Sequence, residues 1–102
     1  MAISPVSKRL KESRLTAGLS QKSLGIAAGI DEFSASARMN QYETGKHTAD
    51  YSTVSLIAKV LKMPAAYFYA DTNEIATMIV YFNNPSKAQK ETCLKKIIKL
   101  IP

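Results

Sequence analysis

Side chains suited to hydrogen bonding with nucleobases are concentrated in one short stretch of the chain. Asn40 and Gln41 each carry an amide that can pair with adenine through two hydrogen bonds, and Arg38 can donate to guanine or to a phosphate. Ala37 can touch a thymine methyl group. We expect Gln41 and Ser36 to read bases. For Arg38 and Asn40 a second interpretation stays open, in which they only solvate a helix or cap a neighbour, because many groove-side residues contact backbone alone.

Residues suited to phosphate binding lie on either side of this stretch. Gln21 falls in the first turn of an expected helix, where free backbone N–H groups and the helix dipole attract an anion. Lys22 and Lys46 are companion cations, and such contacts position a protein on DNA without reading its sequence. Thr44 is a further candidate for DNA contact. His47 is another, although a lone histidine is as often structural or simply exposed.

The apolar pattern predicts an all-α chain that would hold these candidates, since no segment shows the strict alternation of a half-buried strand. The expected helices cover residues 5–16, 21–28, 36–42 and 52–62, a short turn at 65–70, and then residues 73–82 and 87–101. Ser4, Ser20 and Ser86 are predicted N-caps, and either Asp71 or Thr72 caps the sixth element.

Apolar side chains at helical spacing are expected to hold these helices together. Ile3, Val6 and Leu10 form one side of the first helix, and Leu24 packs from the second. The aromatic cluster at 67–69 is expected to pack over the bundle. The fourth helix has an apolar face of Val54, Ile57, Ala58 and Leu61. The helix at 73–82 has one of Ile75, Met78, Ile79 and Phe82, and the last helix has one of Leu94, Ile97, Ile98 and Ile101.

Length and composition limit the classes of protein that this chain can be. Its 102 residues, 46% of them hydrophobic, suit one folded domain, and 14 Lys and Arg against 8 Asp and Glu give a net charge of +6. This charge favours a polyanionic partner, although membrane-surface proteins share it. The sequence has no long apolar run or signal-peptide pattern, so we expect a cytoplasmic protein without a membrane partner. Cys93 is the single cysteine, and nothing predicts a metal site, a cofactor, a small-molecule substrate or an enzyme active site.

The order of residues across the second and third predicted helices resembles the Cro and phage-repressor type of helix-turn-helix, the Xre family. The matching runs are Leu19-Ser20-Gln21-Lys22-Ser23-Leu24-Gly25, then Gly29-Ile30, then Met39-Asn40-Gln41-Tyr42-Glu43-Thr44-Gly45-Lys46. The resemblance covers roughly residues 7–70. It implies a five-helix, lambda-repressor-like DNA-binding domain over residues 1–70, with one or two further helices in an extension over residues 71–102.

The resemblance also implies roles for particular residues. Gln21 becomes a phosphate clamp, and Arg14 and Glu43 become a structural ion pair that fixes the end of the recognition helix against the first helix. The chain departs from the usual family spacing at one place. It carries about four extra residues around 31–34, which makes the turn longer than the usual three or four residues. Aligned from Glu43, the pattern supports Gln41 and Asn40 better than the residues at the start of the recognition helix.

The extra turn residues include two acids, Asp31 and Glu32. Carboxylates beside DNA would be repelled by phosphates, so we expect this loop to turn aside or to cap a helix.

These observations predict a sequence-specific transcriptional regulator, a repressor, that binds a palindromic double-stranded operator as a homodimer. The expected recognition helix covers residues 36–42. The alternative is a protein-interaction module on the same scaffold, such as an antitoxin or an antirepressor partner, docking on the last helix. That last helix can form the dimer interface, or its apolar stripe can fold back onto its own domain.

Overall fold

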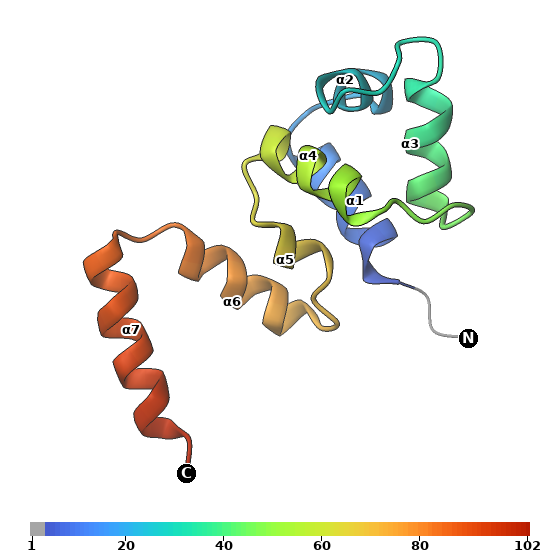
Figure 1. The fold of residues 1–102 in the computed structure, drawn as a ribbon. Coiled ribbons are helices and arrows are strands. Elements are labelled where there is room, and N and C mark those ends of the chain that lie inside the picture. The colour runs from blue at the N-terminus through green and yellow to red at the C-terminus, as the bar shows by residue number, and fades with distance from the viewer. Residues whose placement is uncertain (1–3) are drawn as a thin grey trace.

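The computed structural model describes residues 4–102, and over this range the chain is all-α, as predicted, with seven helices (Figure 1). They are α1 (Pro5–Thr16), α2 (Gln21–Ala27), α3 (Ala35–Thr44), α4 (Tyr51–Leu61), α5 (Ala65–Phe68), α6 (Asn73–Asn83) and α7 (Lys87–Leu100). The expected contribution of Ile3 to the apolar side of α1 lies outside the described residues.

Side-chain caps at helix N-termini explain why the helices begin where they do. The Ser4 hydroxyl accepts a hydrogen bond from the Val6 N–H at 3.3 Å, and the Ser20 hydroxyl accepts one from Ser23 at 3.0 Å. Ser86 closes a reciprocal capping box at α7, and Thr72, not Asp71, caps α6. Each of these bonds satisfies a backbone N–H group that has no partner within its own helix.

Helix α3, the expected recognition helix, differs from the prediction at both ends. It starts at Ala35, one residue earlier than expected, and continues to Thr44, two residues later. Tyr42 does not end the helix because the left-handed turn that stops it lies at Gly45, whose φ is 79°. The expected range therefore ended two residues short of Thr44, the last helical residue before Gly45.

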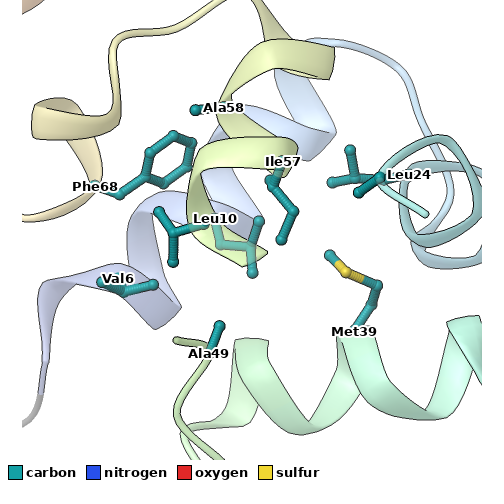
Figure 2. Close-up of a cluster of buried hydrophobic side chains, with 10 residues drawn as sticks. Val6, Leu10, Leu24, Met39, Ala49, Ile57, Ala58 and Phe68 are labelled. Carbon is teal, nitrogen blue, oxygen red and sulfur yellow. The ribbon is translucent and has the colours of Figure 1, made fainter. Parts of the chain in front are cut away.

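The core lies among α1 to α5 (Figure 2). Its largest fully buried side chains are Phe68, Leu10, Leu24, Met39, Ile57 and Val54. Each such side chain contributes about 1.5–3 kcal/mol through removal of apolar surface from water. The predicted aromatic cluster is only partly in this core, because Phe68 is buried and Tyr67 half-buried while Tyr69 is 43% exposed. Phe68 alone of the three aromatic side chains is therefore fully in the core.

The last two helices form an arm that extends from this five-helix body (Figure 1). Ala76 is the single buried residue of α6, and α7 has none. The apolar stripe of α7 is open to solvent here, since its residues Leu94 and Ile98 are 45% and 66% exposed.

Candidate nucleic-acid interface

Helix α3 presents one face to the core and the other to solvent. Ala35 and Met39, one helical turn apart, are fully buried and fix the orientation of the helix. The opposite face, at helical spacing from these two, carries Ala37, Asn40, Gln41 and Thr44. All of them are exposed except Gln41, which is half-buried. The outer face of α3 is thus largely open to solvent and is rich in hydrogen-bonding groups.

Helices α2 and α3 approach each other closely because of Gly25. A Cβ atom built on Gly25 would lie 2.9 Å from the Ala35 Cβ and 3.1 Å from the Met39 Cγ. Any side chain at this position would push the two helices apart. Gly25 is a determinant that sequence reasoning missed, although a glycine inside a short predicted helix is a signal of close packing.

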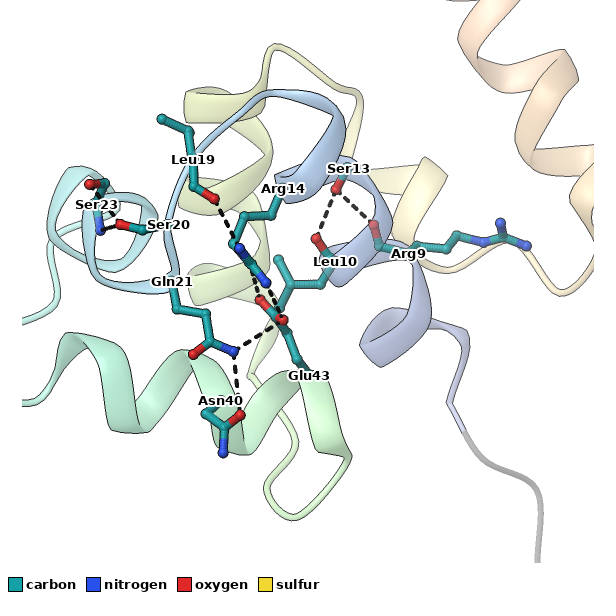
Figure 3. A network of polar contacts seen from close by, with 10 residues as sticks. All are labelled: Arg9, Leu10, Ser13, Arg14, Leu19, Ser20, Gln21, Ser23, Asn40 and Glu43. Carbon is teal, nitrogen blue, oxygen red and sulfur yellow. Dashed lines mark hydrogen bonds and ion pairs between the residues drawn. The ribbon is translucent and has the colours of Figure 1, made fainter.

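Arg14 and Glu43 meet in a bidentate ion pair, as the resemblance implied (Figure 3). Arg14 Nε lies 2.6 Å from Glu43 Oε2, and Arg14 Nη2 lies 2.9 Å from Glu43 Oε1. The third donor, Nη1, binds the Leu19 carbonyl oxygen at 2.9 Å. The hydrogen bond to Glu43 raises the pKa of Arg14 above its ordinary value, so the guanidinium stays charged. The C-terminal turn of α3 is thereby tied to α1.

Gln21 joins the same network from α2 (Figure 3). Its Nε2 donates to Asn40 Oδ1 at 3.3 Å and to Glu43 Oε1 at 3.2 Å, which engages both amide hydrogens. In this conformation the Gln21 amide therefore positions Asn40 and has no N–H left for a phosphate. Because its oxygen accepts from Gln21, Asn40 keeps its own amide N–H groups for another partner.

The remaining predicted site residues lie at both ends of α3 and beside it. Gln41 lies near the end of the helix, where its backbone carbonyl oxygen accepts hydrogen bonds from the Thr44 hydroxyl at 3.3 Å and from the His47 backbone N–H at 3.2 Å. The other predicted side chains are exposed, namely Lys22, Ser36, Ala37, Arg38, Thr44, Lys46 and His47. The structure therefore brings Gln21, Asn40 and the ion pair into one network and leaves these others at the surface.

The loop with the extra residues does not cap α3. The Asp31 carboxylate accepts a hydrogen bond from the Phe33 backbone N–H at 3.0 Å, and the Asp31 carbonyl oxygen accepts one from Ser34 at 3.0 Å. Ser34, the N-cap residue of α3, makes no side-chain capping bond. Asp31 thus stabilises the turn of its own loop, a local arrangement common for aspartate.

Arg9 is a buried residue that the sequence analysis did not identify. Its side chain donates from Nε and Nη2 to the Ala70 carbonyl oxygen at 2.9 and 2.8 Å, and from Nη1 to Asn73 Oδ1 at 3.4 Å. The guanidinium carbon also lies 5.7 Å from the centre of the Tyr67 ring. Arg9 therefore joins α1 to the segment between α5 and α6. Arg9 follows Val6 by three positions and so lies on the apolar side of α1, which was the sequence signal that its side chain would be buried.

Neither a metal-binding cluster nor a membrane-spanning helix is present in the part of the chain that the structure describes. Across residues 4–102, no three His, Cys, Asp or Glu side chains gather in a group that could bind a metal ion. Among the helices of that same range, none is both long enough and apolar enough to cross a membrane.

The fold and the network together define a helix-turn-helix protein, with α2 and α3 as its two helices. Among solved structures, the chain is similar to the transcriptional regulator BswR, with 42% identity, a TM-score of 0.83, and alignment over 91% of this chain and 92% of that one. The chain therefore belongs to the family of BswR. No protein-family model matches it, and neither does any curated protein.

Proposed function

We propose that this chain is an Xre-type transcriptional regulator that binds double-stranded DNA sequence-specifically, with α3 in the major groove. The observation that carries the proposal is the outer face of α3, which is polar, exposed and held in place by Arg14, Glu43 and Gln21. A major groove admits one α-helix, and a rigid helix can present side chains to base edges in a fixed register. The similarity to the regulator BswR supports the same role.

Within this proposal the site residues have different tasks. Asn40 and Gln41 read bases, Asn40 through the amide hydrogens that its contact with Gln21 leaves available. Ser36, Ala37, Arg38 and Thr44 contact base edges or sugar–phosphate. Lys22, Lys46 and His47 bind phosphates and supply the salt-dependent part of the affinity. Gln21 acts indirectly, because its amide positions Asn40.

The proposed mode is repression by a homodimer on a palindromic operator, because occupancy of a promoter excludes other proteins from it. Two copies of α3 would read two half-sites about one helical turn apart. The exposed apolar side chains of the arm support the dimer, since a monomer would leave them in water. They are Ile75, Met78, Tyr81, Leu94 and Ile98, which are 45–71% exposed.

Selection from a pool of randomised duplexes tests the proposal. The wild-type protein should enrich a palindromic sequence, and Gln41→Ala should weaken binding to it about 5- to 100-fold, the cost of one base-reading pair. Lys22→Ala should weaken binding to every duplex alike and reduce the slope of affinity against salt by about one. Lys59→Ala, an exposed cation on α4, is the charge-matched control and should change neither. Equal binding to all duplexes would refute sequence-specific regulation.

Substitutions in α7 test whether the arm forms the dimer interface. Ile98→Asp should convert the dimer to monomer in light scattering, because a carboxylate would be buried in the interface. Lys99→Asp, on the neighbouring position of α7, is the control and should leave the mass unchanged. A monomeric wild-type protein would contradict the dimer.

The same arm supports the second candidate, a protein-interaction module such as an antitoxin or an antirepressor partner. Its apolar face would then be covered by a different protein. That candidate predicts binding that is insensitive to salt and to Gln41→Ala, and sensitive to Ile98→Asp.

A further inference from the structure

Phe33 lies in the loop between α2 and α3 and is 91% exposed, more than any other large hydrophobic side chain in residues 4–102. It belongs to none of the contacts described for the interface. An aromatic ring left in water loses the stabilisation that burial would give. Its position beside the recognition helix therefore raises the question of what covers it.

The loop that presents Phe33 is ordered by its own hydrogen bonds. Asp31 holds the turn through the Phe33 and Ser34 backbone N–H groups, each at 3.0 Å. On the other side, the Ile30 N–H donates to the Gly25 carbonyl oxygen at 2.9 Å, and the Ile30 side chain packs against the core. The ring is thus presented from a fixed turn, so little conformational entropy is lost when a partner covers it.

Phe33 lies close to the N-terminal end of α3. Phe33 precedes Ala35, the first residue of α3, by two positions, so the two Cα atoms lie within about 7 Å of each other. Ala35 is fully buried against Gly25, which fixes this end of α3 to α2. In a helix-turn-helix, the N-terminal end of the recognition helix is the part that enters the major groove. A ring at this place is brought to the groove together with Ser36 and Ala37.

We propose that Phe33 is a specificity-determining residue that packs against a thymine methyl group in the major groove, at the edge of the bases read by α3. This inference rests on the proposed function and adds to it a residue and the group that it recognises. The thymine methyl is the apolar group that base edges present in that groove, and phenylalanine is among the side chains that contact it. The Asp31 carboxylate points into its own turn, where it accepts the Phe33 N–H, and the approach of the ring to a base edge must outweigh the repulsion between the loop's two acids and nearby phosphates. Glu32, the next residue of the loop, is exposed, and its substitution gives a second test of whether the loop lies beside DNA.

The experiment uses the selected operator with each thymine replaced in turn by deoxyuridine, which lacks only the methyl group. For wild-type protein, the dissociation constant should rise about 3- to 5-fold at one thymine in each half-site, the value of one methyl-sized apolar contact. Phe33→Ala should bind the intact operator about that much more weakly and should show no further loss at that thymine. Phe33→Leu should keep part of the discrimination. Ala37→Ser is the matched control for the other methyl contact and should leave this thymine's effect unchanged.

Glu32→Gln supplies an independent readout. If the loop lies beside DNA, removing this carboxylate should strengthen binding to every duplex by a similar factor, with no change in sequence preference. All variants are at exposed positions, and their thermal unfolding should match that of the wild-type protein.

Several outcomes would overturn the inference. An unchanged deoxyuridine profile in Phe33→Ala would do so, and so would a Phe33→Ala change in assembly or partner binding without a change in DNA affinity. An affinity insensitive to Glu32→Gln would place the loop away from DNA. If one of these outcomes is found but Gln41→Ala still alters the sequence preference, the proposed function stands and only the role of Phe33 is refuted. Absence of sequence preference in the wild-type protein would refute both.

Discussion

The five-helix body and the α6–α7 arm differ in where their apolar side chains go. In the body, Leu10, Leu24 and Phe68 are almost completely buried by other helices of the same chain. In the arm, Tyr81 is 71% exposed and Ile98 66% exposed, although both helices are well capped. Caps and helical periodicity thus suffice to form a helix, whereas burial of its apolar face needs a second surface that packs against that face. The body carries its own second surface, and we propose that a second copy supplies that of the arm.

The largest expected effect is in the core of the body. Phe68→Ala should lower the free energy of unfolding by about 3–5 kcal/mol, because it removes a fully buried ring and leaves a cavity. Tyr81→Ala in the arm is the matched aromatic truncation and should change the unfolding of the body by less than about 0.5 kcal/mol. Denaturant unfolding followed at protein concentrations where the chain is monomeric measures both. Similar losses would show that the arm is part of the folded core.

The ion pair comes next. Glu43→Ala should destabilise the body by about 3 kcal/mol, since it leaves the Arg14 guanidinium, only 10% exposed, without its carboxylate. The double variant Arg14→Met with Glu43→Leu should recover most of that loss, because two apolar side chains leave no buried charge. Urea unfolding of the wild type, of Arg14→Met, of Glu43→Leu and of the double variant gives the coupling energy. Additive single losses would mean that the two residues stabilise the protein independently.

Arg9 tests the connection between the two regions. Arg9→Met should remove the hydrogen bonds to the Ala70 carbonyl oxygen and cost about 1–3 kcal/mol of local stability. Hydrogen exchange should then become faster in α5 and α6 and stay unchanged in α3. Lys8→Met, an exposed neighbour, is the control. Faster exchange throughout the body would contradict a role confined to the junction.

The smallest expected effect concerns the α4 cap. Hydrogen bonds from the Thr53 side chain, the Thr53 backbone and Ser52 lower the pKa of Asp50 below its ordinary value of 3.8. The stabilisation is therefore fully present above pH 3.8 and is lost as the pH falls through the lowered pKa. The melting temperature of wild type should exceed that of Asp50→Asn near neutral pH, and the difference should shrink in acid. A constant difference would show that the charge of Asp50 does not stabilise α4.

Local signals in the sequence predicted much of this structure. Val54, Ile57 and Ala58 recur at helical spacing and are all buried, and Ser4 and Ser20 cap the helices that they were expected to cap. These features depend on neighbours within one or two turns, which periodicity and capping rules describe well. The Arg14–Glu43 pairing came from the family resemblance, because a pair 29 residues apart has no local signal.

Features that depend on tertiary packing were not predictable in the same way. Arg9 bonds to a carbonyl oxygen 61 residues away, and Gln21 bonds to Asn40 across the helix-turn-helix. Neither partner can be identified until the helices are placed. The exposure of Phe33 was equally hidden, since an aromatic residue between two helices usually suggests a core contact. The apolar face of α6 was predicted, but a pattern along one helix does not indicate which molecule covers it.

Hydrogen exchange of the protein with and without its selected duplex tests the central claim, that the body reads DNA and the arm does not. DNA should slow exchange in α2, in α3 and in the segment through His47, and should leave α7 unchanged at protein concentrations where the dimer is already formed. Slower exchange confined to α7, with α3 unaffected, would contradict this claim.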